Sequence, residues 1–249
     1  MKKSKNICFI AALIFMVGAL AQPPYAASFD IPEKLSYDLT WAGIKTGEAS
    51  LEIRDNGSHI QFISKAVSAG WVSVFYRVED NVISILKKEG YGNFAFTPKS
   101  YRLKVREGKH KRDREIVFDH AAKKAVYINH LDNKKTESGI SGSTFDPLSS
   151  LYYLRGIRLE VGKPVFIDVF DSKKLYKMEV QVLRKETVET PSGTFETILV
   201  KPVMRSEGIF YRKGDILIWL TDDEKRIPML LKTKVALGSV KAVITNSRY

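Results

Sequence analysis

The sequence predicts an all-β protein in which one curved antiparallel sheet, an open half-barrel, wraps around one or two short helices. Apolar and polar residues alternate with a period of two along segments 33–41, 48–54, 101–106 and 176–183. Such alternation places one face of a strand on a core and the other in water. Turn residues separate the expected strands at intervals of roughly 8–14 residues, as in a meander or barrel. Because sheets of more than about ten strands curl, we expect a curved sheet with a helix against its concave face.

Two turn motifs and one apolar strand support this organisation. Asp55-Asn56-Gly57 separates two alternating segments and is typical of a tight hairpin, because Asn and Gly tolerate positive φ. Segment 190–193 carries Pro and Gly where a type I turn favours them. Segment 216–220 is apolar on both faces, which indicates a strand that is covered on both sides.

Residues 146–155 predict a short helix. Asp146 is a favoured N-cap residue, Pro147 fits the first helical position, and Gly156 follows the last turn. Leu148, Leu151 and Tyr152 share a face that Arg155 can also join, and we expect this largely apolar face to pack on the sheet.

The N-terminal segment has the three parts of a secretory signal peptide. Lysines precede the apolar run 7–17, and the small residues Ala19 and Ala21 follow it where signal peptidase requires them. The run is shorter than a comfortable membrane span, which disfavours an uncleaved anchor. We therefore expect cleavage after Ala21, a signal peptide at 1–21, and a single exported β domain at 22–249 in the periplasm.

Composition and charge narrow the class of protein. The chain has 249 residues, of which 44% are hydrophobic and 27% charged, and this excludes a disordered chain, a collagen-like repeat and a protein with several membrane spans. Its formal charge is +12, and segment 1–21 holds three of the lysines, so +9 remains after cleavage. The charge suits anionic partners, and export disfavours nucleic acid among them.

The one cysteine, Cys8, lies in the segment that is removed, so we expect neither disulfide nor lipid-modified cysteine. We expect a monomer.

No residue constellation identifies a reaction. The four histidines are scattered without the spacing of a zinc site, and segment 139–143 resembles a nucleophile elbow only in composition. The acidic segment 222–224 is typical of a polar connecting turn. We therefore expect no catalytic residue, no metal and no cofactor, and a protein that is not an enzyme.

A dense basic cluster occupies residues 99–114. Its candidate contacts to an anionic surface are Arg102, Lys104, Arg106, Lys109, Lys111, Arg112 and Arg114. Alternation places the first three on one outward face, and Gly108 indicates a hairpin turn. One interpretation is a solvated hairpin whose charges keep a sheet edge from pairing. The other is a contact for phospholipid or lipopolysaccharide head groups.

The mature chain resembles a bacterial exported family, the domain of unknown function 3108 (DUF3108), over nearly all of residues 32–249. The stretches that carry the resemblance are Leu35–Ile44 with Gly47–Ala49, Phe75–Asp80, Asp146–Arg155, and Gly208–Phe210 with Ile218–Asp223 and Arg226–Pro228. The resemblance implies an all-β, curved-sheet protein that is loosely similar to half-barrel carriers of the LolA and LolB type. It carries over no catalytic residue, so it implies fold and compartment and leaves function open.

Three functions remain. The first is a non-enzymatic periplasmic protein that binds or carries a lipidic or amphipathic ligand, such as a lipid or lipopolysaccharide. The second is an assembly factor of the envelope or its surface polysaccharide, which acts through contacts with an envelope protein. The third is an enzyme with a dispersed site. Fold analogy favours the first.

A hydrophobic cavity would favour the carrier. Segment 69–76 is too apolar for an ordinary loop, so we expect either a short helix or a lid over the sheet. Together with the helix at 146–155, it is expected to cover a cavity lined by Trp71, Phe75, Leu148, Leu151 and Tyr152. The competing interpretation is that these residues only complete the core.

Overall fold

The computed structural model describes residues 29–89, 96–205, 216–234 and 238–248 of the chain. The expected signal peptide at 1–21, with Cys8, lies outside these ranges. The first eight strands are β1 (Glu33–Trp41), β2 (Ile44–Asp55), β3 (His59–Ser68), β4 (Val78–Lys87), β5 (Thr97–Glu107), β6 (His110–Asp119), β7 (Lys124–Asn129) and β8 (Lys134–Gly139). The others are β9 (Thr144–Phe145), β10 (Val165–Asp171), β11 (Lys174–Thr190), β12 (Gly193–Arg205), β13 (Ile216–Thr221), β14 (Pro228–Lys234) and β15 (Ser239–Arg248). The helices are α1 (Gly70–Ser73) and α2 (Pro147–Arg155), and neither is long and apolar enough to cross a membrane.

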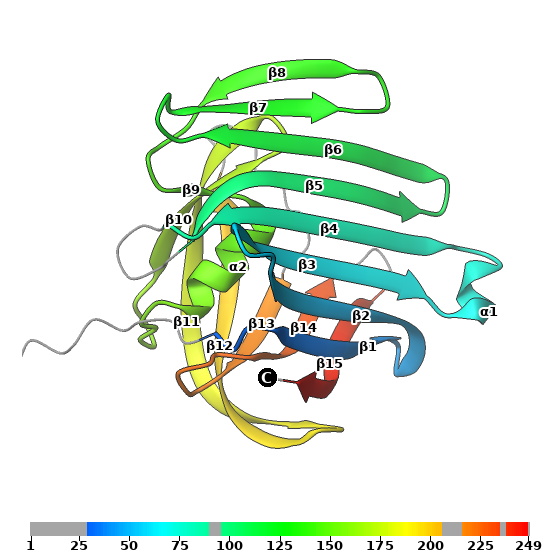
Figure 1. Ribbon diagram of the computed structural model, residues 1–249. Coiled ribbons are helices and arrows are strands. Elements are labelled where there is room, and N and C mark those ends of the chain that lie inside the picture. The colour runs from blue at the N-terminus through cyan, green and yellow to red at the C-terminus, as the bar shows by residue number, and fades with distance from the viewer. Residues whose placement is uncertain (1–28, 90–95, 206–215, 235–237, 249) are drawn as a thin grey trace, which may run out of the picture.

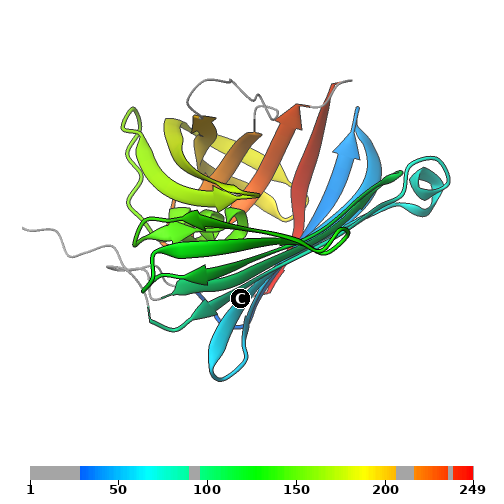
Figure 2. The ribbon, with the colours of Figure 1, turned by 90° about the horizontal axis from the view of Figure 1, so that it is seen from above.

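In the described chain, fifteen strands form one sheet in the order β8-β7-β6-β5-β4-β3-β2-β1-β15-β14-β13-β12-β11-β10-β9. Neighbours are antiparallel except β9 and β10, which are parallel. Strands β1–β8 form a first wall and β10–β15 a second, and the walls meet where β1 pairs with β15 (Figures 1 and 2). Right-handed twist accumulates over so many strands and folds the sheet back on itself. The predicted all-β class and single curved sheet are confirmed.

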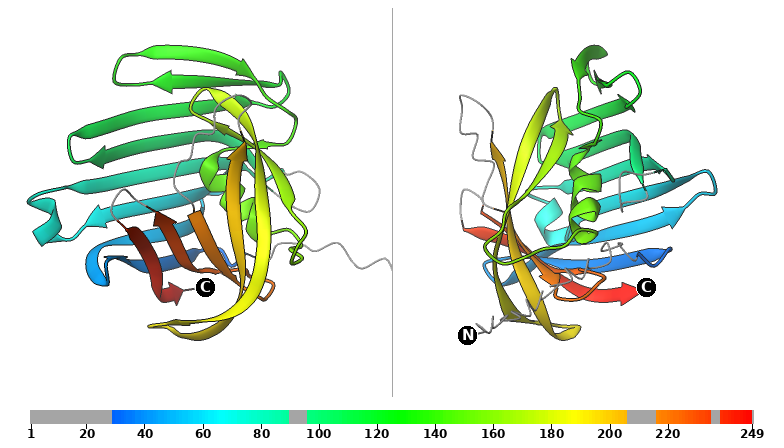
Figure 3. Two further views of the ribbon diagram at one scale, coloured as in Figure 1. Left: turned by 180° about the vertical axis from the view of Figure 1, so that it is seen from behind. Right: turned by 90° about the vertical axis from the view of Figure 1, so that its left-hand side faces the viewer.

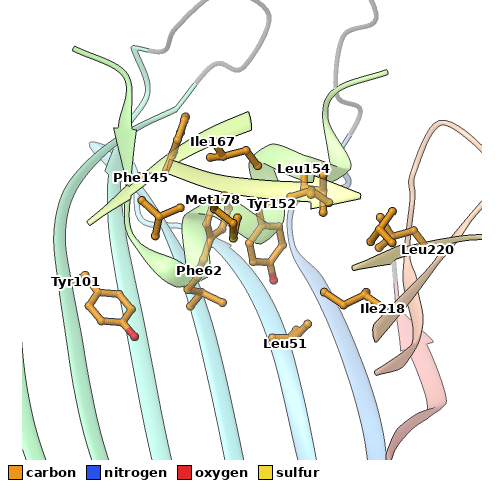
Figure 4. Packing of buried hydrophobic residues seen from close by; sticks show 14 of the residues in the cluster. Leu51, Phe62, Tyr101, Phe145, Tyr152, Leu154, Ile167, Met178, Ile218 and Leu220 are labelled. Carbon is orange, nitrogen blue, oxygen red and sulfur yellow. The ribbon is translucent and has the colours of Figure 1, made fainter. Parts of the chain in front are cut away.

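Cross-strand registers show which side chains face the space between the walls. Leu51 lies opposite Leu35, Phe62 opposite Ile53, and Tyr101 opposite Ser84, and all of these are buried. Helix α2 lies against this inner face, between the two walls (Figure 3). Figure 4 shows side chains from both walls and α2 packed together there, in the main hydrophobic core. A smaller cluster of Val188, Leu199 and Trp219 covers the other face of the second wall. Strand β13 is therefore buried on both sides from Ile218 onward, as predicted, whereas Ile216 at its start is exposed.

Asp146 caps α2 and also ties the helix to the first wall. Its carboxylate accepts hydrogen bonds from the backbone N–H groups of Leu148 and Ser149, both at 2.9 Å, and from the Ser149 hydroxyl at 2.8 Å. The Ser84 hydroxyl of β4 donates a fourth, at 2.6 Å. Burial raises the pKa of Asp146, whereas these bonds act in the opposite direction by favouring the carboxylate.

Arg155 ties the last turn of α2 to both walls. Its guanidinium donates two parallel hydrogen bonds, of 2.8 and 2.7 Å, to the carboxylate of Glu33 in β1. It also donates to the Lys225 carbonyl in the β13–β14 turn, at 3.2 Å. The two charged side chains are only 1% and 2% exposed. Burial lowers the pKa of Arg155, but the hydrogen bonds and charge of Glu33 outweigh it and hold the pKa above its ordinary value.

Helix α1 accounts for segment 69–76, and it does not lie over the sheet. It lies in the β3–β4 connection, at the far end of the first wall from α2 (Figure 1). The direction of β3 explains this position. Phe62, early in β3, stacks on Tyr152 of α2, whereas Ser68 ends the strand next to α1.

Removal of both charges of the buried ion pair should cost less than the sum of the single removals. Arg155→Met or Glu33→Leu alone leaves one buried charge without its partner, which costs about 3–5 kcal/mol. The double variant leaves no such charge. Urea unfolding followed by circular dichroism measures all three free energies. Arg158→Ala, at a side chain that is 57% exposed, is the control and should cost less than about 0.5 kcal/mol. Strictly additive losses would contradict the expectation.

Candidate functional site

The five residues predicted to line one cavity lie in two separate places. On α2, Leu148 and Tyr152 are buried and Leu151 is half-buried. Near α1, Trp71 and Phe75 are 54% and 87% exposed. The helices lie at opposite ends of the first-wall strands (Figure 1), so the described chain forms no shared cover over all five. This corrects the expected grouping and leaves the α2 residues as the candidates on the inner face.

Tyr152 marks the place where the cover provided by α2 ends. Its ring stacks on Phe62 with the centroids 3.9 Å apart, and its hydroxyl points away from α2 toward Leu51 (Figure 4). The residue is fully buried, and the hydroxyl has no hydrogen-bond partner in the described chain. Tyr37 of β1 is also buried, but its hydroxyl donates to the Pro228 carbonyl at 2.9 Å. Burial raises the pKa of both tyrosines, so each is a neutral donor near pH 7.

Beyond Tyr152, toward the strand ends away from α2, the inner face is only half-buried. We call this region the distal inner face. Its apolar and small residues are Ala49, Ser64, Ala66, Val82, Leu103, Leu231 and Ala242. Registers place them on the same side as the core, since Ala49 lies opposite Tyr37 and Leu231 opposite Ala242. Both walls therefore contribute a partly exposed apolar surface at the end that α2 leaves open.

The predicted basic cluster lies on the β5–β6 hairpin, but its residues divide between the two faces of the sheet. The outer face holds Arg102, Lys104, Arg106 and Lys111, and Lys109 lies in the exposed turn. Arg112 and Arg114 lie opposite Val105 and Leu103, which places them on the inner face. The shared outward face of the first three residues is as predicted. The seven basic residues, however, do not form one contact surface.

On the outer face, acidic neighbours neutralise much of the charge of Arg102. It pairs with Asp113 at 2.6 Å and with Glu115 at 2.9 Å, and it contacts His130. A shallow hollow of about 360 Å³ beside it is lined by Asn81, Ile83, Ile85, Ser100, Arg102, Lys104 and Glu115. The more exposed positive charges of the hairpin are its lysines.

On the inner face, charged groups lie at the edge of the distal inner face. Arg112 pairs with Glu107 at 2.8 Å, and Arg114 donates to the Ser172 hydroxyl in the β10–β11 turn of the second wall at 3.2 Å. Asp80 lies opposite Ala66 and Val105 and accepts a hydrogen bond from the Arg106 N–H at 3.2 Å. Burial, together with the charge of Glu107, raises the pKa of Asp80 to about 6.

Among the residues that the structure describes, no group of three or more His, Cys, Asp or Glu side chains could hold a metal ion. Segment 222–224 forms a polar turn, in which Asp223 accepts from the Thr221 hydroxyl at 2.6 Å and the Arg226 N–H at 2.9 Å.

Sequence reasoning missed Glu33 and Asp80. Alternation gives the face of each residue, but it does not identify a partner 122 positions away, as Arg155 is for Glu33.

Comparison with one solved structure supports the fold. A β-barrel-like protein of the domain of unknown function DUF1849 from Brucella abortus matches with a TM-score of 0.57 and 14% identity, over 88% of this chain and 97% of that one. A candidate exported protein with a YmcC-like fold from Bacteroides fragilis has a TM-score of 0.35 at 10% identity, over 91% and 100% of the two chains. A candidate lipoprotein from Parabacteroides distasonis has 0.34 at 10%, over 90% and 97%. At these identities the likeness concerns the fold alone.

No curated protein matches the chain. The family model of DUF3108, a protein family of unknown function, matches residues 36–245, which include most of β1, all of β2–β14, both helices and most of β15. The chain therefore belongs to the DUF3108 family.

Proposed function

We propose that this chain is an exported protein of the cell envelope that binds an amphipathic, lipid-like ligand on its distal inner face. The observation that carries the proposal is the half-buried apolar surface that α2 leaves between the two walls. Burial of apolar surface is favourable by about 25 cal/mol per Å². Helix α2 covers one end of the inner face, so the apolar surface at the other end remains free to bury an apolar ligand. The signal-peptide pattern at residues 1–21 supports the compartment.

Polar groups at both ends of this surface suit an amphipathic ligand. The Tyr152 hydroxyl is a buried donor without a protein partner in the described chain, and such a group is stabilised when an oxygen accepts from it. Arg112 and Arg114 lie on the inner face at β6, paired with Glu107 and bonded to Ser172 respectively, and an anionic head group would bind their guanidinium groups there. These residues include no nucleophile held by a general base, so we propose binding and not catalysis.

The raised pKa of Asp80 fits partial burial of its carboxyl group at the edge of the distal inner face. The residue lies opposite Ala66 and Val105, its carboxylate accepts from the Arg106 N–H, and burial is the largest cause of the shift. A surface that disfavours a carboxylate in this way favours contact with an acyl chain.

A bulky side chain on the distal inner face should block ligand binding. Ala66→Trp fills the inner face, whereas Val67→Trp, at a neighbouring residue that is exposed on the outer face, is the matched control. Titration of the mature protein with a fluorescent fatty acid should show an affinity at least about tenfold lower for Ala66→Trp and within about twofold for Val67→Trp. Circular dichroism checks that both variants fold. Equal affinities in both variants would contradict the site. If no lipid class binds the unmodified protein, the assembly-factor function takes its place.

Tyr152→Phe should separate ligand binding from stability. Loss of a buried hydroxyl without a protein partner should leave the free energy of unfolding unchanged or raise it by roughly 1 kcal/mol. Affinity for the fatty-acid probe should fall about fivefold or more, because the ligand loses a donor. Tyr76→Phe, at a tyrosine that is 50% exposed, is the control and should change neither. A clear loss of stability in Tyr152→Phe would show that the hydroxyl serves the fold.

Asp80→Asn should raise thermal stability at pH 7.5 but not at pH 4.5. The pKa of Asp80 is about 6 in the folded protein and about 3.9 unfolded, so the folded state binds the proton more tightly. The stabilisation by protonation is complete below the unfolded value and is lost as the pH rises through the folded value. Asp55→Asn should act in the opposite direction at pH 7.5, because the hydrogen bond from Lys88 lowers the pKa of Asp55. Melting curves at both pH values measure this, and a pH-independent effect of Asp80→Asn would refute it.

A further inference from the structure

A second apolar surface lies around α1, apart from the distal inner face. We call it the aromatic tip, and its residues are Trp41, Ile44, Trp71, Val74, Phe75 and Tyr76, all exposed. Phe75 and Val74 are the most exposed of them, at 87% and 77%. The Ala69 N–H donates to the Thr46 carbonyl at 2.8 Å, which joins α1 to the β1–β2 hairpin. Figures 1 and 2 show α1 projecting beyond the end of the first wall.

The hydroxyl of Ser73, the polar side chain of α1, is hydrogen-bonded within the chain, whereas the apolar Trp71 is exposed. The Ser73 hydroxyl lies 2.7 Å from that of Ser68 and donates to the Ala69 carbonyl at 3.0 Å. The Ser68 hydroxyl in turn accepts from the Val78 N–H at 2.9 Å. No residue of α1 is buried. An ordinary surface turn exposes polar residues, whereas the β3–β4 connection exposes apolar ones. Exposed apolar patches of this kind are typical of interaction sites.

Basic residues adjoin the aromatic tip. The Tyr76 ring packs over Gly108 in the β5–β6 turn, where even a methyl group would come within 2.8 Å of the ring. The Gly108 N–H donates to the Arg77 carbonyl at 2.8 Å. These contacts bring the exposed Lys109 and Lys111 alongside the tip. Aromatic rings flanked by lysines are typical of side chains that lie at a membrane–water interface.

We propose that the aromatic tip docks onto the surface of an anionic phospholipid bilayer, with its rings among the head groups and Lys109 and Lys111 against phosphates. Charge complementarity favours this occupant, because the chain from residue 22 onward carries +9. A protein partner fits less well, since specific protein interfaces bury about 800 Å² per partner, whereas a projecting four-residue helix offers a small convex surface. Docking brings the open end of the distal inner face toward the bilayer. Exchange of a lipid between the bilayer and the distal inner face would depend on the proposed function. The docking itself does not depend on it.

Vesicle co-sedimentation of the mature protein tests the docking. Vesicles contain phosphatidylethanolamine with phosphatidylglycerol, or phosphatidylcholine alone. Trp71→Ser combined with Phe75→Ser should lower partitioning onto the anionic vesicles at least about tenfold, because the apolar anchors are lost. Val161→Ser combined with Phe166→Ser removes two exposed apolar residues elsewhere and should change partitioning by less than about twofold. Lys109→Glu combined with Lys111→Glu should weaken binding to the anionic vesicles only, and more strongly at low salt.

Two results would overturn the docking. One is equal partitioning of the tip variant and the Val161/Phe166 control. The other is that the unmodified protein does not partition onto vesicles, which is also the result expected if the tip binds only another protein. Ligand binding is tested separately. The tip variant should keep the affinity of the unmodified protein for the fluorescent fatty acid, and Ala66→Trp should still sediment with vesicles. Loss of vesicle docking therefore leaves fatty-acid binding measurable, and loss of fatty-acid binding leaves docking measurable.

Discussion

The buried ion pair between Arg155 and Glu33 determines where α2 lies, and the division of the inner face follows from that position. A helix of nine residues is not stable alone, so α2 depends on contacts with the sheet. Arg155 joins it to β1 and to the β13–β14 turn, while Asp146 joins its other end to β4. Both attachments lie toward the same ends of the strands. The helix therefore seals one end of the inner face and leaves the other half-buried.

Much of the fold could be predicted, because local patterns decide it. Alternation reports which face of a strand is apolar, and the β2–β3 turn with Gly57 at a φ of +75° has the conformation that Asn-Gly favours. The N-cap of α2 and Pro147 behave as their propensities require. The division of the basic hairpin was also accessible from the sequence. A two-residue turn at Gly108 and Lys109 places Arg112 and Arg114 opposite apolar residues of β5, and that count identifies their face.

The candidate site could be predicted only in part, because it depends on contacts between distant segments. The sequence marks Tyr152 as apolar-facing, but whether its hydroxyl finds a partner depends on both walls at once. Likewise, the apolar character of segment 69–76 was evident, but whether it covers the sheet or projects from it depends on the direction of β3. The pKa of Asp80 also depends on neighbours in several strands, since burial and the charge of Glu107 in β5 raise it and the charge of Arg112 in β6 lowers it. Periodicity identifies faces of strands and does not identify neighbours.

The pairing of β1 with β15 has a consequence for how the protein is made. Almost every other strand pairs with a neighbour in the chain, so those hairpins can form as the polypeptide lengthens. Within the described sheet, strand pairing joins the two walls only through the first and last strands, where the Thr245 hydroxyl also donates to the carbonyl of Ser36, 209 positions earlier. Because a chain is made from its N-terminus, β1 stays unpaired on one side until synthesis of the final strand is complete. During that interval β1 is an open strand edge. An open edge is prone to aggregation unless another molecule covers it.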